Sequence, residues 1–203
     1  MRLRRLPATR AAAARYAAEL WLPYHRDLAE RVADHALADR PDGELIAEET
    51  AFRLDRLRED DYRLWVVSVA VESGPSGDGG SSALGSSTPG GADPRSLDPA
   101  DPAPPGVPDP DRDLVAFVST GVDACPVVFD RPDRLVVGDL YVSAPYRGTV
   151  LADRLMERAV ADARERNCEE IRLDVDVDNE RALGFYEKQD FEAYRKQLTR
   201  DVE

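Results

Sequence analysis

The chain has 203 residues, of which 40 are acidic and 27 basic, so its formal net charge is −13. A domain this acidic repels phosphate backbones, which excludes nucleic acid as an expected partner. The two cysteines, Cys125 and Cys168, have no partner at CxxC or metal-ligand spacing. We therefore expect neither a disulfide scaffold nor a metal site.

The sequence shows no sign of export or of membrane insertion. The basic start, residues 1–7, has no apolar run behind it, so it does not resemble a signal peptide. No stretch approaches the roughly 20 apolar residues that a membrane-spanning helix needs. We expect a cytoplasmic protein without a membrane partner.

The basic residues are almost all arginine, with Lys188 and Lys196 as the exceptions. Excess acid with so little lysine is typical of proteins from a salt-rich cytoplasm, and arginine is favoured by a GC-rich genome. Attraction of a cationic substrate is the alternative explanation of the acidity. At molar salt the Debye length is only ~3 Å, so long-range attraction would be lost, and we favour the first explanation.

The N-terminal part is predicted to be a short strand followed by helices. A strand is expected at Leu3–Leu6 and a helix over 9–22, which Pro23 interrupts or restarts and which then runs to about Asp39. A further helix is expected near 44–59. Its buried stripe would consist of Leu45, Ala51, Phe52, Leu54 and Leu57.

Residues 72–112 differ sharply in composition from the rest. They hold nine of the 15 prolines and eight of the 13 glycines, without any aromatic residue. Such a segment cannot bury enough apolar surface to offset its ordering entropy, which predicts a disordered loop. The strand-like runs Leu64–Val71 and Leu114–Ser119 flank it, so we expect one domain over 1–203, with an antiparallel hairpin interrupted by this insertion. A linker between two domains is the alternative.

Beyond the insertion, strands and helices alternate. Strands are predicted at Leu135–Val142 and Ile171–Val177, a helix over 148–166, a shorter helix over 179–188 and a last strand around 191–199. Two β-α-β units make the central strands parallel, while the earlier strands pair as antiparallel hairpins. The expected fold is α/β, with a mixed sheet flanked by helices.

The segment from Leu140 to Ala152 carries the clearest chemistry. A strand leads through a turn with Arg147 and Gly148 into the start of a long helix. A helix N-terminus offers unpaired N–H groups, arginine adds a planar cationic fork, and glycine allows close approach of the backbone. The pattern indicates a pyrophosphate site. An ordinary strand-to-helix turn is the alternative.

Two blocks of sequence resemble the GNAT (GCN5-related N-acetyltransferase) superfamily. Val142, Pro145, Arg147, Gly148 and Ala152 match its acetyl-CoA motif. Residues 179–191, NERALGFYEKQDF, are similar to its second block, N-x-x-A-x-x-F-Y-x-K-x-G-F. The resemblance covers roughly residues 135–195. Together with the composition, it suggests a GNAT protein from a halophilic archaeon.

The resemblance implies an N-acyltransferase that moves an acetyl group from acetyl-CoA to a primary amine by direct attack in a ternary complex. The acceptor would be an amine-bearing small molecule or a protein, and a homodimer is compatible with the exposed strand edges. Tyr186 would be the general acid that protonates the leaving thiolate. Strand residues would hold the pantetheine, the following turn and helix start the pyrophosphate, and Asn179 the pantetheine arm. The cofactor residues implied are Leu140, Tyr141, Val142, Arg147, Gly148, Thr149, Val150, Leu151, Ala152, Asn179 and Lys188.

The general base has two candidates. Asp139 is polar within an apolar strand, and alternation places it on the face of Leu135, Val137 and Tyr141. Asp174 is the second candidate, although Asp174, Asp176 and Asp178 alternate with apolar residues in the pattern of a solvated strand face.

Two positions depart from the family pattern. Val150 stands where the motif has its first glycine, and Asp190 replaces the glycine before Phe191. If the position of Val150 requires a positive φ, valine would cost on the order of 1–3 kcal/mol. These departures leave open a second function, a catalytically weak or inactive GNAT-fold module that senses acyl-CoA or binds proteins.

Overall fold

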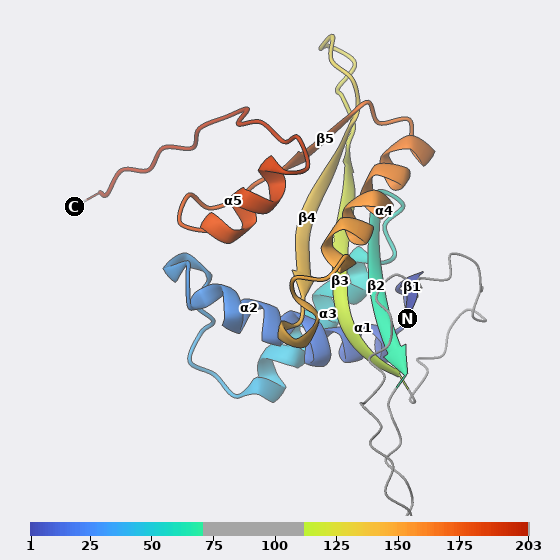
Figure 1. Cartoon of the computed structure of the whole chain (residues 1–203), viewed down its shortest axis with the longest axis vertical. Coiled ribbons are helices and arrows are strands. Elements are labelled where there is room, and N and C mark those ends of the chain that lie inside the picture. Colours follow the sequence, from blue (N-terminus) through green and yellow to red (C-terminus); the bar gives the residue numbers. More distant parts are fainter. Residues whose placement is uncertain (71–111, 203) are drawn as a thin grey trace, which may run out of the picture.

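The computed structural model describes residues 1–70 and 112–202 (Figure 1). The predicted insertion at 72–112 lies outside the described residues, apart from Arg112. Five strands form one sheet in the order β1-β2-β3-β4-β5. Their bounds are Arg2–Arg5 (β1), Tyr62–Ala70 (β2), Arg112–Asp123 (β3), Arg134–Val142 (β4) and Glu170–Leu173 (β5).

The pairing of the strands confirms the predicted mixed sheet. The first three pairings are antiparallel, and β4 and β5 are parallel. Tyr62 at the start of β2 faces Gly121 near the end of β3, and Ala70 faces Arg112. The two runs that flank the insertion are therefore neighbours in one sheet, as the hairpin interpretation requires.

The first helical region is more continuous than a helix interrupted at Pro23, but it is shorter than predicted. Helix α1 (Arg10–Tyr16) begins after Thr9, whose side-chain oxygen accepts the N–H of Ala12. It passes without a break into a π-helical turn, η1 (Ala17–Trp21), and then into α2 (Leu22–Ala29). Pro23 is the second residue of α2, directly after the π-helical turn, and it does not interrupt the helix. The helix ends ten residues before the predicted Asp39, and a short 3₁₀ turn, η2 (Ala33–His35), follows.

Helix α3 (Asp42–Arg56) corresponds to the predicted helix over 44–59, but its buried stripe differs. Leu45 and Leu57 are buried as expected, whereas Phe52 is 58% exposed. Glu49 and Arg53 are buried instead, because they pair with each other at 2.7 Å and the guanidinium of Arg53 also donates to the Tyr62 hydroxyl. A buried ion pair thus lies on the inner face of α3, at two positions that the predicted apolar stripe did not include.

Two hydrophobic clusters hold helices on the two faces of the sheet. Helix α4 (Leu151–Glu165) buries Leu151, Leu155 and Met156 against β3, β4 and β5. On the other face, Tyr16, Leu20 and other side chains of α1 and η1 pack against Phe117 and Tyr141. The rings of Tyr16 and Phe117 meet edge to face at 5.0 Å.

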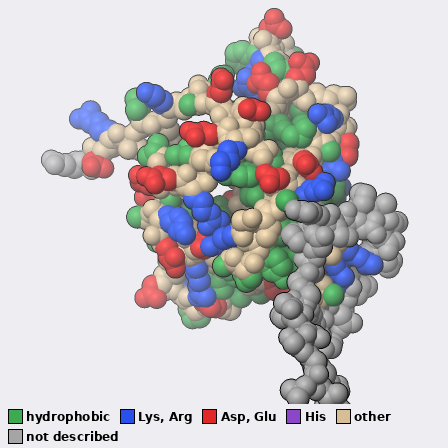
Figure 2. Space-filling model, in the orientation of Figure 1, with side chains coloured by type: hydrophobic (Ala, Val, Ile, Leu, Met, Phe, Trp, Pro, Cys, Tyr) green, Lys and Arg blue, Asp and Glu red, His purple; other side chains and the backbone are tan. Residues whose placement is uncertain are grey.

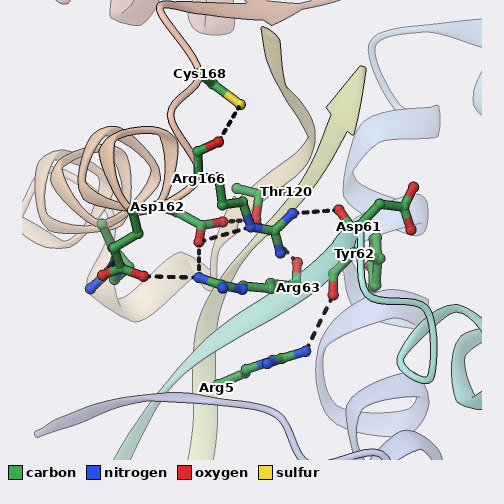
Figure 3. Close-up of polar contacts among 10 residues, drawn as sticks. Arg5, Asp61, Tyr62, Arg63, Thr120, Asp162, Arg166 and Cys168 are labelled. Atoms are coloured by element: carbon green, nitrogen blue, oxygen red, sulfur yellow. Dashed lines mark hydrogen bonds and ion pairs between the residues drawn. The ribbon is translucent and has the colours of Figure 1, made fainter. Parts of the chain in front are cut away.

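A buried polar network fastens the C-terminal end of α4 to β2 and β3 (Figure 3). Asp162 is fully buried, accepts the hydroxyl of Thr120 at 2.6 Å and contacts the guanidiniums of Arg63 and Arg166. Arg166 also donates to the carbonyl of Asp61 at 2.6 Å. One carboxylate therefore contacts two arginines and joins three elements of secondary structure.

The C-terminal region departs from prediction at β5 and beyond. Strand β5 ends at Leu173, so the acidic row at 174–178 is a loop and not a strand face. Helix α5 (Glu180–Glu187) forms as predicted. The prediction of a last strand around 191–199 is wrong, since residues 191–202 have no regular secondary structure. With only four residues, β5 offers a short edge for another strand. Tyr194 instead places its ring 5.2 Å from the guanidinium of Arg134.

Candidate active site

A cavity of about 360 Å³ lies between α2, the second half of β4, the start of α4, and α5. In Figure 1, α2 and α5 lie on the same side of β4, with α4 on the other. Ten of the residues predicted from the sequence line this cavity: Leu140, Tyr141, Val142, Arg147, Gly148, Thr149, Ala152, Asn179, Tyr186 and Lys188. The two sequence blocks that resemble the GNAT superfamily therefore meet around one cavity.

Strand β4 forms one wall because its pairing with β5 ends early. The parallel ladder runs from Arg134 and Glu170 only as far as Val137 and Leu173. Leu140, Tyr141 and Val142 continue β4 beyond this point and line the cavity. On the side of β4 that faces β5, the backbone groups of this stretch are not paired with β5. They can form hydrogen bonds with an extended ligand, in the way that they would with a neighbouring strand.

A β-bulge in β4 places Asp139 differently from the predicted alternation. Opposite Ser119, β4 has two residues, Gly138 and Asp139, since Val118 pairs with Leu140 and Thr120 with Val137. The hydroxyl oxygen of Ser119 accepts the N–H of Asp139 at 2.8 Å. A Cβ on Gly138 would come within 2.8 Å of the same oxygen, so this position requires glycine or a shift of Ser119.

The bulge reverses which residues of β4 face which cluster. Leu135 and Val137 pack on the α4 side, and so do Leu140 and Val142, whereas Tyr141 packs on the α1 side. The prediction that Asp139 shares a face with Leu135 and Val137 was wrong, because the extra residue shifts the period of two. Asp139 is instead close to Tyr24, whose hydroxyl bonds to its carboxylate.

Tyr186, on α5, carries its phenol into the cavity. Its ring makes edge contacts with Phe185 at 5.3 Å and Phe191 at 5.6 Å, which hold it on the inner side of α5. Burial, and to a lesser extent the negative charge of Asp139, raise the pKa of Tyr186 to about 12. The phenol therefore keeps its proton at neutral pH and is available as a donor.

The turn before α4 has the backbone that the sequence pattern implied, with one difference. Gly148 has φ +71°, in the left-handed region that favours glycine. Val150, in contrast, has φ −72° and is the N-cap residue of α4 without a side-chain cap. Valine adopts this conformation without strain, so the replacement of glycine at this position carries no backbone penalty.

Three predicted residues have roles other than lining the cavity. Leu151, the first residue of α4, is fully buried, and Val150 directly precedes that helix. Asp139 lies beside the cavity and does not line it. The side-chain oxygen of Asn179 caps α5 by accepting the N–H of Ala182 at 3.2 Å. Its amide nitrogen is the group left for a ligand.

The side chain of Arg147 is held by the protein itself. Its Nε donates to the carbonyl of Val142 at 3.0 Å, and its Nη2 lies 2.8 Å from the carboxylate of Asp27 on α2. Its guanidinium also lies 5.7 Å from the centre of the Tyr141 ring. These contacts join the turn before α4 to both β4 and α2.

Sequence reasoning missed the contribution of α2 to the cavity, together with Arg181 on α5. Tyr24, Asp27, Leu28 and Arg31 all line it. Their spacing of three and four residues places them on one side of a helix, and this spacing could have predicted that they share a surface. Figure 2 shows basic side chains gathered where α2 and α5 lie next to each other; Arg31, Arg147, Arg181 and Lys188 line the cavity there.

Histidines lie beside this cavity, where α2 and η2 approach the loop after β5. His25 packs between Trp21 and Tyr24, each at 4.8 Å between ring centres, and burial lowers its pKa. His35 stacks on His25 at 6.2 Å and bonds to Asp176 at 2.9 Å. The contact between His35 and Asp176 ties η2 to the loop before α5. Within the described residues, no group of three or more side chains is suited to hold a metal ion.

Comparisons with known proteins agree with this geometry. Residues 97–191 match the model of the Acetyltransferase (GNAT) family. Over 58 residues the chain is 38% identical to N-alpha-acetyltransferase 30 of Saccharomyces cerevisiae, a match that covers 29% of this chain and 33% of that protein. The chain thus spans about a third of the length of this curated relative.

Solved structures show the same fold at low sequence identity. The BH1408 protein of Bacillus halodurans, as a tetramutant, superposes with a TM-score of 0.61 at 13% identity, over 100% of both chains. Aminoglycoside N-acetyltransferase AAC(6')-Iy, in complex with CoA, superposes with a TM-score of 0.52 at 10% identity, over 98% of this chain and 93% of that one. The chain has the α/β GNAT fold, and residues 97–191, just under half of its length, match the model of the Acetyltransferase (GNAT) family.

Proposed function

We propose that this chain is an acetyl-CoA-dependent N-acetyltransferase, built as a single GNAT domain, that acetylates a primary amine by direct attack in a ternary complex. One observation carries the proposal. The phenol of Tyr186, the unpaired stretch of β4 and the turn before α4 line the same cavity. A proton donor, a backbone edge and an anion-binding turn are the three elements that acyl transfer from a nucleotide thioester requires.

The residues present fit the nucleotide end of acetyl-CoA. Helix α4 begins behind Gly148, around which there is open space, and its N-cap residue Val150 supplies no side-chain cap. In its first turn, the N–H of Leu151 donates to the Thr149 hydroxyl at 3.4 Å. Four basic side chains line the cavity, against the carboxylates of Asp27 and Asp153. This balance of charge suits a ligand with several phosphates.

Acetyl-CoA, when bound, supplies the activated acetyl thioester. Backbone groups of Leu140–Val142 would bind the amides of the pantetheine arm, and a main-chain N–H of this stretch would stabilise the developing oxyanion. Tyr186 would donate its proton to the departing sulfur. Asp139 would accept the proton that the attacking ammonium must lose, while Tyr24 fixes the direction of its carboxylate.

The acceptor is a primary amine, on a small molecule or a protein. Among the similar proteins are an aminoglycoside N-acetyltransferase and an N-alpha-acetyltransferase, which by their names act on these two kinds of amine. Tyr24 and His25 of α2 lie near Asp139, and the ring of Trp21 packs on His25 at 4.8 Å. These three side chains would form the wall that contacts the acceptor.

Thermal unfolding at molar KCl, with and without acetyl-CoA, tests the cofactor assignment. A ligand at 100 times its Kd adds about 2.7 kcal/mol to the free energy of unfolding, so a clear rise in Tm is expected. ATP at equal concentration controls for non-specific anion binding. Release of free thiol with a panel of amines then tests transfer. No rise at millimolar acetyl-CoA would contradict the proposal, whereas a rise without transfer to any amine would favour an acyl-CoA-sensing module.

A further inference from the structure

Asp27 places a carboxylate inside the basic part of the cavity. It lies on α2, and its Oδ2 is 2.8 Å from Nη2 of Arg147 and 3.9 Å from Nη1 of Arg181. The side chains of Asp27 and Arg147 are only 25% and 24% exposed. An ion pair at this depth is screened less by salt than one on the open surface.

The surrounding charges show why an anion is held here. Burial, followed by the positive charges of Arg147 and Arg31, lowers the pKa of Arg181. Three guanidiniums are therefore close enough to repel one another, and the carboxylate of Asp27 offsets part of that repulsion. The guanidinium of Arg31 makes no ion pair within the described part of the chain.

A phosphate group and a carboxylate compete for the same planar donor fork. The Arg147 fork is turned toward Asp27, while the Nε of the same side chain is occupied by the carbonyl of Val142. A diphosphate at the start of α4 would therefore compete with Asp27 for Nη2 of Arg147.

We propose that Asp27 is a built-in competitor of the cofactor diphosphate, which occupies Arg147 and Arg181 in the free protein and lowers the affinity for acyl-CoA. This inference rests on the proposed function, because it assumes that the cavity binds a coenzyme A thioester. It assigns to α2 a role in setting the affinity for the cofactor, in addition to its place beside the acceptor.

Calorimetric titration with coenzyme A tests the proposal. Asp27→Asn removes the competing charge and keeps the shape of the side chain, so CoA should bind roughly tenfold more tightly, as expected for one hydrogen-bonded charge pair. Asp42→Asn is the matched control. Asp42 pairs with Arg26 of α2 but is 51% exposed and does not line the cavity, so CoA affinity should change less than about twofold.

A double-mutant cycle shows whether Asp27 acts through Arg147. In an Arg147→Gln background, Asp27→Asn should give a markedly smaller gain in CoA affinity. Asp27→Ser serves as a second variant, with folding checked by thermal melting. Unchanged or weaker CoA binding by folded Asp27 variants would overturn the inference and make Asp27 a positioning residue. Failure of the wild type and every variant to bind CoA would instead refute the proposed function.

Discussion

The buried network around Asp162 gives the sharpest stability prediction. Replacement by asparagine keeps the volume but removes the negative charge that faces Arg63 and Arg166. Glu165 still contacts Arg63 at 2.9 Å, yet its side chain is 50% exposed and offers weaker compensation. Each arginine already has one buried nitrogen without a partner, Nε of Arg63 and Nη2 of Arg166. The variant therefore leaves Arg166 without a carboxylate partner among the described residues, and Arg63 with Glu165 alone.

The expected loss follows from the fully buried position. Removing one partner of a buried ion pair costs about 3–5 kcal/mol in the free energy of unfolding. For a chain of this size, each kcal/mol lowers Tm by about 2–4 °C, so Tm should fall by roughly 6–20 °C. The affinity for CoA should stay unchanged, because none of these residues lines the cavity.

Urea denaturation at fixed KCl measures this loss without adding a second electrolyte. Glu165→Gln is the control, since it removes a charge from the same network at an exposed position and should cost less than about 1 kcal/mol. Equal losses of stability for Asp162→Asn and Glu165→Gln would show that burial does not determine how much each ion pair with Arg63 stabilises the fold. That result would refute the reasoning.

Three further predictions concern the site and the turn after α5. Tyr186→Phe should lower kcat by about 100-fold or more while the Kd for CoA changes less than twofold; full turnover would remove Tyr186 from the acid role. Because the pKa of Tyr186 is raised to about 12, the phenol stays protonated as pH rises, so the rate should show no loss of this acid between pH 7 and 10. A fall in that range that disappears in Tyr186→Phe would contradict the assignment. Asp190 has φ +61°, where glycine is less strained, so Asp190→Gly should raise the free energy of unfolding by about 0.5–1 kcal/mol in urea melts, with no gain expected for Asp201→Gly.

The acidic composition suggests an origin in a salt-rich cytoplasm. This origin stays a prediction, because the fold does not test it. Among the described residues, no helix is long and apolar enough to cross a membrane.

The local pattern of the sequence was sufficient for much of the fold and the cofactor side of the site. Alternation and helical periodicity predicted all five described strands, although β5 ends four residues earlier than predicted, and the helices α4 and α5. These signals depend on neighbours within a few residues. Residues 140–152 and 179–191 identified the turn and α5, since the turn before α4 and the helix that carries Tyr186 are each built from contiguous residues. Ten of the predicted residues line the cavity for this reason.

Tertiary structure alone decided the rest. The bulge at Gly138 and Asp139 arises from an unequal count of residues on β3 and β4, which no single strand reveals, and it turned Asp139 toward Tyr24. No strand follows α5: residues 191–202 have no regular secondary structure, although the sequence predicted a strand around 191–199. Asp27 entered the basic cavity because α2 packs beside α5, and such contacts between residues 120 or more apart depend on the packed sheet, which brings these helices together.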